Sequence, residues 1–169
     1  FASSQHNLGV AYEGGVGVPV DLAQAHMWLD LAASQSSGEF PEEVWYRLAA
    51  EQGHAQAQFN LGTLYFTGRS VPQDDAEAVR WYQLAAEQGH VDAQWNLGLL
   101  YELGAGVSQD SVAAYVWLNL SASRRHSGDS NLELVAHDRG RVAGKMSGDQ
   151  VDEANRLARE WDAAHPREP

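Results

Sequence analysis

Residues 57–65 read Ala-Gln-Phe-Asn-Leu-Gly-Thr-Leu-Tyr, and residues 93–101 read Ala-Gln-Trp-Asn-Leu-Gly-Leu-Leu-Tyr, 36 positions later. A second stretch, residues 45–54, returns at the same spacing as residues 81–90. Part of the first stretch also opens the chain, at residues 5–12. A period of roughly 20–50 residues is typical of stacked units that bury their apolar faces only against neighbours. The sequence therefore predicts a repeat protein, a class whose surfaces usually bind other molecules.

Each repeat contains two runs of apolar residues at helical spacing. Within residues 56–89, the first run ends at Gly68, and the second run follows Asp74 and closes at Gly89. Glycine is common just after a helix, and aspartate is common just before one. Each unit is therefore predicted to be a helix, a short turn and an antiparallel helix.

Large and small residues recur at fixed places in these helices. Glycine in the middle of a helix costs about 0.5–1 kcal/mol relative to alanine, so its recurrence indicates close helix packing. Aromatic residues at repeat spacing are what a stacked core requires. The glycines are Gly9, Gly62 and Gly98, and the aromatic residues are Tyr12, Tyr65, Tyr101, Trp28, Trp45, Trp81 and Trp117.

The pattern resembles that of the Sel-one-like repeat (SLR) family, relatives of the tetratricopeptide repeat. The matching motifs are A-Q-x-N-L-G-x-x-Y-x-x-G, then V-P-x-D, then A-x-x-W-x-x-L-A-A-x-x-G, and they cover nearly the whole chain. The resemblance implies an all-α fold, a right-handed α-solenoid of antiparallel helix pairs. It also implies a concave face, lined mainly by first helices, that binds other proteins.

We expect a single solenoid domain over residues 1–169. Its parts are a repeat at 1–39, a half repeat at 40–54, repeats at 55–90 and 91–128, and C-terminal capping helices at 129–163. The half repeat begins at Pro41, and proline suits a helix start, so a helix is predicted over 41–52. Its sequence is that of a second helix without a first. Either local repacking absorbs this deletion, or the stack is distorted near 34–54 and forms a concavity.

The two ends of the chain differ. Helices are predicted at 130–145 and 148–162, and Ser147 to Gln150 has the spacing of a capping box. This segment looks like the closing cap of many bacterial members of the family. Phe1 aligns with His54, so the chain begins at the edge of a repeat. We expect a fragment or processed product that further repeats could precede, and the uncapped first repeat could associate with another copy.

Composition limits the partners. The 169 residues contain 11 Lys and Arg against 23 Asp and Glu, which gives a net charge of −12. This charge argues against nucleic acid and anionic membranes as partners. It favours a protein or peptide ligand that is basic or apolar. Alternatively, the acidic surface serves solubility alone. Cysteine is absent, so the chain forms no disulfide, and no apolar stretch approaches the ~20 residues of a membrane span. Bacterial cytoplasm and periplasm or secretion both remain open.

The sequence contains no recognisable catalytic, metal-binding or phosphate-binding motif. Of the seven histidines, His54 and His90 share one repeat position, and the others lack ligand-like spacing. The glycine pairs near 15–17 and 104–106 lie in repeat turns and lack the Lys and Ser/Thr of a phosphate loop. We therefore expect no enzyme, no catalytic residue, no metal and no cofactor.

One set of residues is a candidate binding site. By analogy with tetratricopeptide repeats, certain first-helix positions face the groove, and residues at one position in successive repeats form ladders. Aromatic members could hold apolar side chains, asparagines could pair with a peptide backbone, and glutamates at the rim could hold a Lys or Arg. The set comprises His6, Asn7, Val10, Glu13, Phe59, Asn60, Thr63, Phe66, Trp95, Asn96, Leu99 and Glu102.

The leading hypothesis is a protein–protein interaction scaffold that binds a peptide or partner protein on its concave face. A hydrolase acting on a cell-wall-related substrate is one alternative, suggested by discussion of some family relatives, although no nucleophile and base are recognisable. A structural spacer within a longer repeat array is the other.

Overall fold

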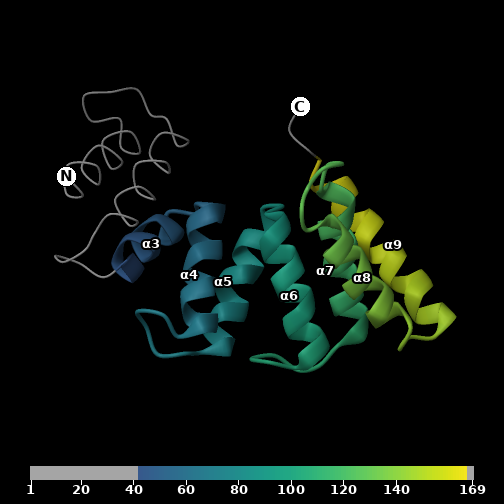
Figure 1. The fold of residues 1–169 in the computed structure, drawn as a ribbon. Helices are drawn as coiled ribbons and strands as arrows, with labels where there is room; N and C mark the ends of the chain where they lie inside the picture. Colours follow the sequence, from purple (N-terminus) through teal and green to yellow (C-terminus); the bar gives the residue numbers. More distant parts are fainter. Residues whose placement is uncertain (1–41, 167–169) are drawn as a thin grey trace. The chain divides into compact units, whose positions relative to one another are not determined.

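The computed structural model describes residues 42–166, and residues 1–41 and 167–169 lie outside the described part. Every regular element among the described residues is an α-helix, which confirms the all-α prediction (Figure 1). The chain divides into two compact units between Asp74 and Asp75, and each unit is described by itself.

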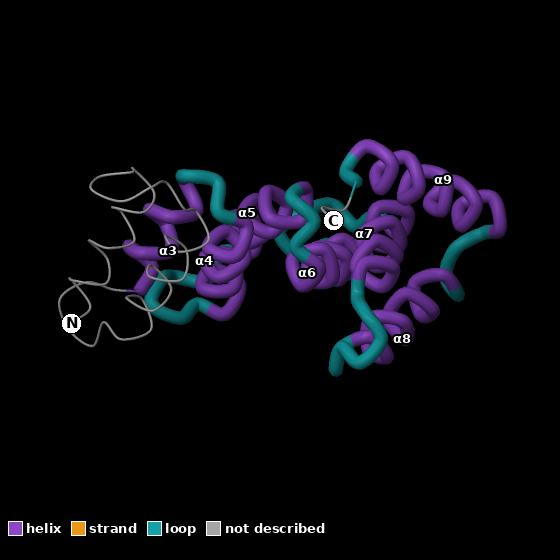
Figure 2. Tube along the Cα trace, turned by 90° about the horizontal axis from the view of Figure 1, so that it is seen from above, coloured by secondary structure: helices purple, strands orange, loops and turns teal. Residues whose placement is uncertain are grey.

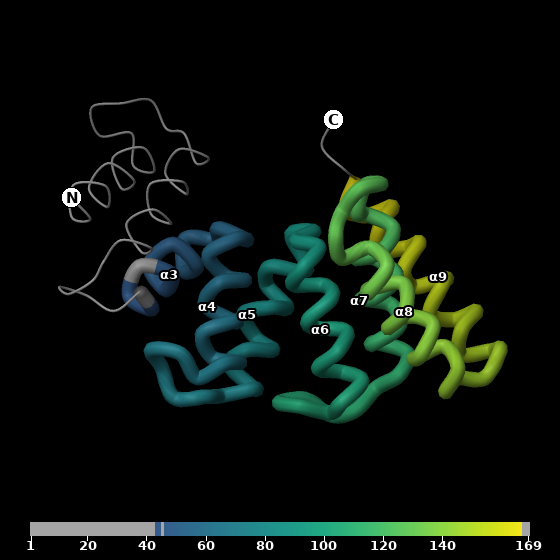
Figure 3. The backbone as a smooth tube through the Cα atoms, in the orientation of Figure 1, coloured from purple at the N-terminus to yellow at the C-terminus, as the bar shows by residue number. Residues whose placement is uncertain are grey.

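The described part of the first unit is one helix pair. It consists of α3 (Glu42–Glu51) and α4 (Ala55–Thr67), which a short turn joins (Figure 3). Ala49, Ala50, Ala57, Leu61 and Leu64 are buried in this unit. The three alanines among them are small enough to let the two helix backbones approach closely.

The second unit contains five helices. They are α5 (Asp75–Glu87), α6 (Val91–Leu103), α7 (Ser111–Arg124), α8 (Leu132–Ala143) and α9 (Gly148–Ala164). Helix α7 is central, because α6, α8 and α9 all pack against it. Seen from above, α8 and α9 diverge on either side of α7 (Figure 2). Helices α8 and α9 lie in the segment where the sequence predicts capping helices, and Ser147 and Gln150 form both hydrogen bonds of a capping box.

One core cluster of this unit joins α7 to α8 and α9. Ala114, Tyr115, Leu118, Val142 and Ala154 form this buried cluster, with Trp95, Tyr101 and Met146 among the side chains packed on its edge. Burial of these residues favours the packing of α8 and α9 on α7, because apolar area contributes about 25 cal/mol per Å² removed from water.

A buried glutamine links each first helix to the second helix before it. Gln58 Nε2 donates to the carbonyl of Ala50 at 3.1 Å, and Gln94 Nε2 donates to the carbonyl of Ala86 at 3.1 Å. The acceptors belong to the last turn of α3 and of α5, and each also accepts from the N–H of the glycine after the helix, Gly53 at 3.0 Å and Gly89 at 2.9 Å. The 36-residue recurrence of Gln therefore has a structural cause.

Of the aromatic residues predicted for the core, Trp81 is buried, whereas Tyr65, Tyr101 and Trp117 are only partly buried. Tyr12, Trp28 and the side chain of Trp45 lie outside the described part.

Candidate functional site

Helix α4 carries a groove on its surface. The groove has a volume of about 300 Å³ and is lined by Tyr46, Phe59, Asn60, Thr63, Leu64, Thr67 and Arg69. We call it the α4 groove. Three of the residues selected from the sequence, Phe59, Asn60 and Thr63, therefore lie together on one surface. The fourth from this helix, Phe66, does not line the groove, but its side chain is 41% exposed.

Hydrogen bonds within α4 determine what the groove presents to a ligand. Thr63 Oγ1 donates to the carbonyl of Phe59 at 3.0 Å, and Thr67 Oγ1 donates to the carbonyl of Thr63 at 2.7 Å. Asn60 Oδ1 accepts from Gln56 Nε2 at 3.1 Å. Because both hydroxyl hydrogens are donated inside the helix, the threonine hydroxyls can only accept from a ligand, and the threonine methyl groups offer apolar contact. The groove is thus suited to apolar contact.

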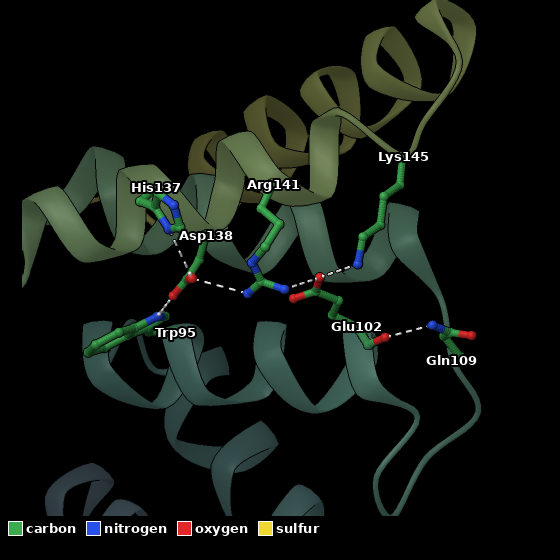
Figure 4. Close-up of polar contacts among 7 residues, drawn as sticks. All are labelled: Trp95, Glu102, Gln109, His137, Asp138, Arg141 and Lys145. Carbon is green, nitrogen blue, oxygen red and sulfur yellow. Dashed lines mark hydrogen bonds and ion pairs between the residues drawn. The ribbon is translucent and has the colours of Figure 1, made fainter.

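Trp95 of α6 occupies the repeat position that Phe59 occupies in α4, and α8 packs against it. Trp95 Nε1 donates to Asp138 Oδ2 of α8 at 2.9 Å (Figure 4). The guanidinium of Arg125 lies 5.7 Å from the Trp95 ring centroid. The ring also packs on the edge of the buried cluster. Trp95 therefore contacts α8 at the position where the sequence predicts a ligand contact.

Glu102 is likewise engaged within the chain. Its side chain is only 3% exposed, and Oε1 accepts from Arg141 Nη1 and from Lys145 Nζ, the latter at 2.8 Å. Figure 4 shows both cations reaching the carboxylate from α8 and the turn after it. The sequence predicts that Glu102 lies at the rim and holds a basic residue of a ligand. In the structure it is buried, and the basic residues that it holds belong to the same chain.

Two of the remaining candidate residues lie on α6, and four lie outside the described part. Asn96 and Leu99 are partly buried on α6, and His6, Asn7, Val10 and Glu13 lie outside the described part. Within residues 42–166, no three His, Cys, Asp or Glu side chains are grouped to hold a metal ion. None of the helices α3–α9 is long and apolar enough to span a membrane.

The side chain of Asp138 joins the two polar contacts between α6 and α8. Its carboxylate accepts from Trp95 and from Arg141 Nη2, the latter at 3.0 Å, and His137 Nδ1 lies 3.7 Å away. Burial raises the pKa of Asp138, but the hydrogen bonds from Trp95 and Arg141 outweigh burial, so the pKa is lowered overall. The ionised form is therefore the one that stabilises the folded protein.

We expect the Asp138→Asn variant to be less stable by about 1–2 kcal/mol at neutral pH, because a charge-assisted bond is lost. The native pKa lies below the unfolded value near 4, so the contribution of the carboxylate is complete above that value. It is lost as the pH falls through the native pKa. Urea unfolding as a function of pH should show the gap between wild type and variant closing in acid. Asp152→Asn, an exposed change on α9, should leave the whole curve unchanged, and a gap that stays constant in acid would contradict this role of Asp138.

No sequence pattern indicated the role of Arg125. Its side chain is 2% exposed, and it pairs with Asp92 at the start of α6 and, at 2.7 Å, with Asp129 in the loop before α8. Burial lowers the pKa of Arg125, whereas the hydrogen bonds with Asp92 and Asp129 raise it by more. An arginine just after a helix is normally exposed, and the equivalent repeat positions are Gly53 and Gly89, so no periodic signal was available.

Comparisons with known proteins agree with this architecture. The family model for the Sel1 repeat matches residues 2–37, 44–54, 55–90 and 91–126. The crystal structure of c5321, described as a protective antigen in uropathogenic Escherichia coli strains displaying an SLR fold, superposes with a TM-score of 0.69. It is 30% identical over 97% of this chain, which spans 38% of c5321. A Sel1 repeat protein from Oxalobacter formigenes is 31% identical, with a TM-score of 0.49, over 81% of this chain and 88% of its own.

One curated relative is the putative sel1-like repeat-containing protein L21 of Acanthamoeba polyphaga mimivirus. It is 36% identical over 63 residues, which make up 37% of this chain and 9% of the relative. The fold class is therefore an α-solenoid of SLR type, as predicted. The chain belongs to the Sel1 repeat family, whose members are generally protein-interaction scaffolds and typically not enzymes.

Proposed function

We propose that this protein binds a peptide or partner protein on the face of its first helices, with α4 as the described part of the site. The α4 groove is the observation that carries the proposal, because it brings Phe59, Asn60 and Thr63 together on one face of α4. The exposed ring of Phe66 adds apolar area on the same helix. Aromatic side chains supply large contact areas and are frequent at protein interfaces.

The chemistry of the groove favours apolar side chains on the partner. Because Glu102 pairs with Arg141 of the same chain, we do not include it in the proposed binding surface. The aromatic residues of α4 carry the proposed affinity. A net charge of −12 favours the approach of a basic partner over long distances, which affects the association rate more than the affinity.

A pull-down from the cells that produce the protein tests this proposal. The immobilised chain is compared with a Phe59→Ala/Phe66→Ala double variant, and captured proteins are quantified by mass spectrometry. We expect the specific partner to fall at least about tenfold on the double variant, since truncating an aromatic anchor costs roughly 2 kcal/mol or more.

Two controls make the result interpretable. Circular dichroism must show that the double variant remains helical, because Phe59 is partly buried. Leu134→Ala removes an exposed apolar side chain from α8 and should leave capture unchanged. A partner retained equally by all three proteins would place the site elsewhere and refute the proposal.

A further inference from the structure

A polar pocket lies between α7 and α9 of the second unit, separate from the α4 groove. Its volume is about 130 Å³, which suits one side chain of a ligand rather than a chain segment. We call it the α7–α9 pocket. It is lined by Asn119, Leu120, Ser123, Ala158, Arg159 and Asp162.

Most cations of the described part pair with a carboxylate of the same chain. Within residues 42–166, Arg139 and Arg159 differ, because the structure gives neither of them an ion pair. Arg139 is partly buried, and Arg159 is exposed. The paired cations are Arg47, Arg80, Arg124, Arg125, Arg141, Lys145 and Arg156.

Both of these arginines lie near the side chain of Asn119 on α7. Arg139 Nη1, from α8, donates to Asn119 Oδ1 at 2.9 Å, and Asn119 Nδ2 donates to Asn155 Oδ1 of α9 at 3.3 Å. Arg159 follows Asn155 by one helical turn and lines the pocket together with Asn119. The two cations without a carboxylate therefore lie near one lining residue, although they belong to helices on either side of α7 (Figure 2).

The acid among the lining residues is already neutralised. Asp162 Oδ1 accepts from Arg124 Nε at 2.9 Å and from Arg124 Nη2 at 2.7 Å. The Arg124 side chain is only 11% exposed, and water screens such a pair less than an exposed one. Asp162 therefore balances the charge of Arg124, and the positive charge of Arg159 is left for a ligand.

The charge of this part of the chain also differs from the total. Residues 111–166 contain 7 Lys and Arg against 8 Asp and Glu, which gives a net charge of −1. The rest of the chain contains 4 against 15, which gives −11. Helices α7, α8 and α9 therefore repel an acidic group far less than the total charge of −12 suggests.

From these observations we infer that the α7–α9 pocket binds the carboxylate of an Asp or Glu side chain of a partner protein. Arg159 holds the carboxylate, because a planar guanidinium can donate two parallel hydrogen bonds to it. Arg139 adds positive charge beside Asn119, and the methylene groups of the acidic side chain contact Leu120 and Ala158. This site is a second one, beyond the proposed function, for a protein whose family generally serves as interaction scaffolds.

Two capped tripeptides provide the probe. Acetyl-Gly-Glu-Gly-amide carries a side-chain carboxylate and no terminal charge, and acetyl-Gly-Gln-Gly-amide is its neutral counterpart. Each is titrated at constant pH into the full chain labelled with ¹⁵N, and two-dimensional NMR identifies the amides that shift. We expect saturable binding of the glutamate peptide on the order of 1 mM, with shifts on α7 and α9. The glutamine peptide should bind at least about fivefold more weakly, because the charge-assisted hydrogen bonds are lost.

Protein variants separate the pocket from general charge effects. Arg159→Gln should weaken binding of the glutamate peptide at least about fivefold, and Arg139→Gln about two- to threefold because it acts from the edge of the pocket. Arg156→Gln is the matched control, since Arg156 lies on the same helix but is held by Glu153 and Glu160. This control should leave the affinity unchanged within about twofold. Thermal unfolding checks that all three variants remain folded.

The other outcomes would overturn the inference. No saturable binding, equal binding of the two peptides, equal losses for Arg159→Gln and Arg156→Gln, or shifts confined to α4 would each do so. Inorganic phosphate or free glutarate that binds at least about tenfold more tightly than the glutamate peptide would assign the pocket to a small anion.

The end of the chain is tested in the same way. Residues 167–169 follow α9 and lie outside the described part. Peptide binding that is seen only when these residues are deleted would mean that they fill the pocket, and the inference would be wrong. The proposed function is tested separately, because capture in the pull-down depends on Phe59 and Phe66 of α4 and not on Arg159.

Discussion

Replacing Gly98 by valine should destabilise the second unit by about 2–4 kcal/mol. A Cβ atom at this position would be 2.8 Å from Leu118 Cγ and 3.1 Å from the carbonyl oxygen of Ala114. Leu118 is fully buried in the core cluster, and the Ala114 oxygen belongs to the backbone of α7, so a side chain at position 98 requires α6 and α7 to move apart. The gain in helix propensity relative to glycine is below about 1 kcal/mol and cannot offset the clash. Urea unfolding followed by far-UV circular dichroism measures the loss.

Gly140 provides a control within the same unit. It lies in α8, and a Cβ atom there would meet nothing within 4 Å. Gly140→Ala should therefore raise the free energy of unfolding by up to about 1 kcal/mol. If Gly98→Val were as stable as the wild type, the close approach of α6 to α7 would be wrong.

Replacing Arg125 by methionine should reduce stability by about 2–4 kcal/mol. Methionine keeps much of the apolar contact of the arginine stem, so the change chiefly removes the charge and its hydrogen bonds. Arg125 connects the start of α6, the end of α7 and the loop before α8. Its loss leaves Asp129 and Asp92 without this cation, and removing one partner of a buried ion pair is costly. The carboxylates are partly exposed, so water recovers some of the loss. Thermal or urea unfolding gives the magnitude.

Arg156→Met is a matched comparison for this prediction. Arg156 also binds two carboxylates, Glu153 at 2.6 Å and Glu160 at 2.5 Å, but its side chain is 50% exposed. Exposed ion pairs contribute little to stability, so this variant should unfold like the wild type within error. Equal losses for the two variants would mean that burial does not determine the importance of Arg125.

The repeat pattern was sufficient to predict the helices. Phe59 to Tyr65 and their copies 36 residues later place first helices where α4 and α6 are found, and Ser147 with Gln150 marks the start of α9. These predictions succeeded because helical periodicity, caps and turn glycines are local properties of the chain. The requirement for a small residue at Gly98 was also predictable, since a costly residue recurred at one position.

The environment of the predicted binding residues was not predictable in the same way. Phe59 and Trp95 occupy the same repeat position, yet Phe59 lines a groove and Trp95 donates a hydrogen bond to Asp138. Glu102 and Phe66 are also equivalent, and Glu102 is buried while Phe66 is exposed. Position within the repeat is identical in each pair, so the difference arises from the helix that packs beside it.

The class of protein and the helix pairs could be predicted from the repeat pattern, because these features depend on residues within one repeat or on its immediate recurrence. The half repeat at 40–54 and the closing cap stay predictions of the same pattern. The packing of α8 and the turn after it against Trp95 and Glu102, and the burial of Arg125, required the three-dimensional structure. So did the groove that Tyr46 of α3 and Phe59 of α4 line together. Those outcomes depend on side-chain volumes that no single repeat encodes and on contacts between different helices, which for Trp95, Glu102 and Arg125 join residues 33 to 43 positions apart.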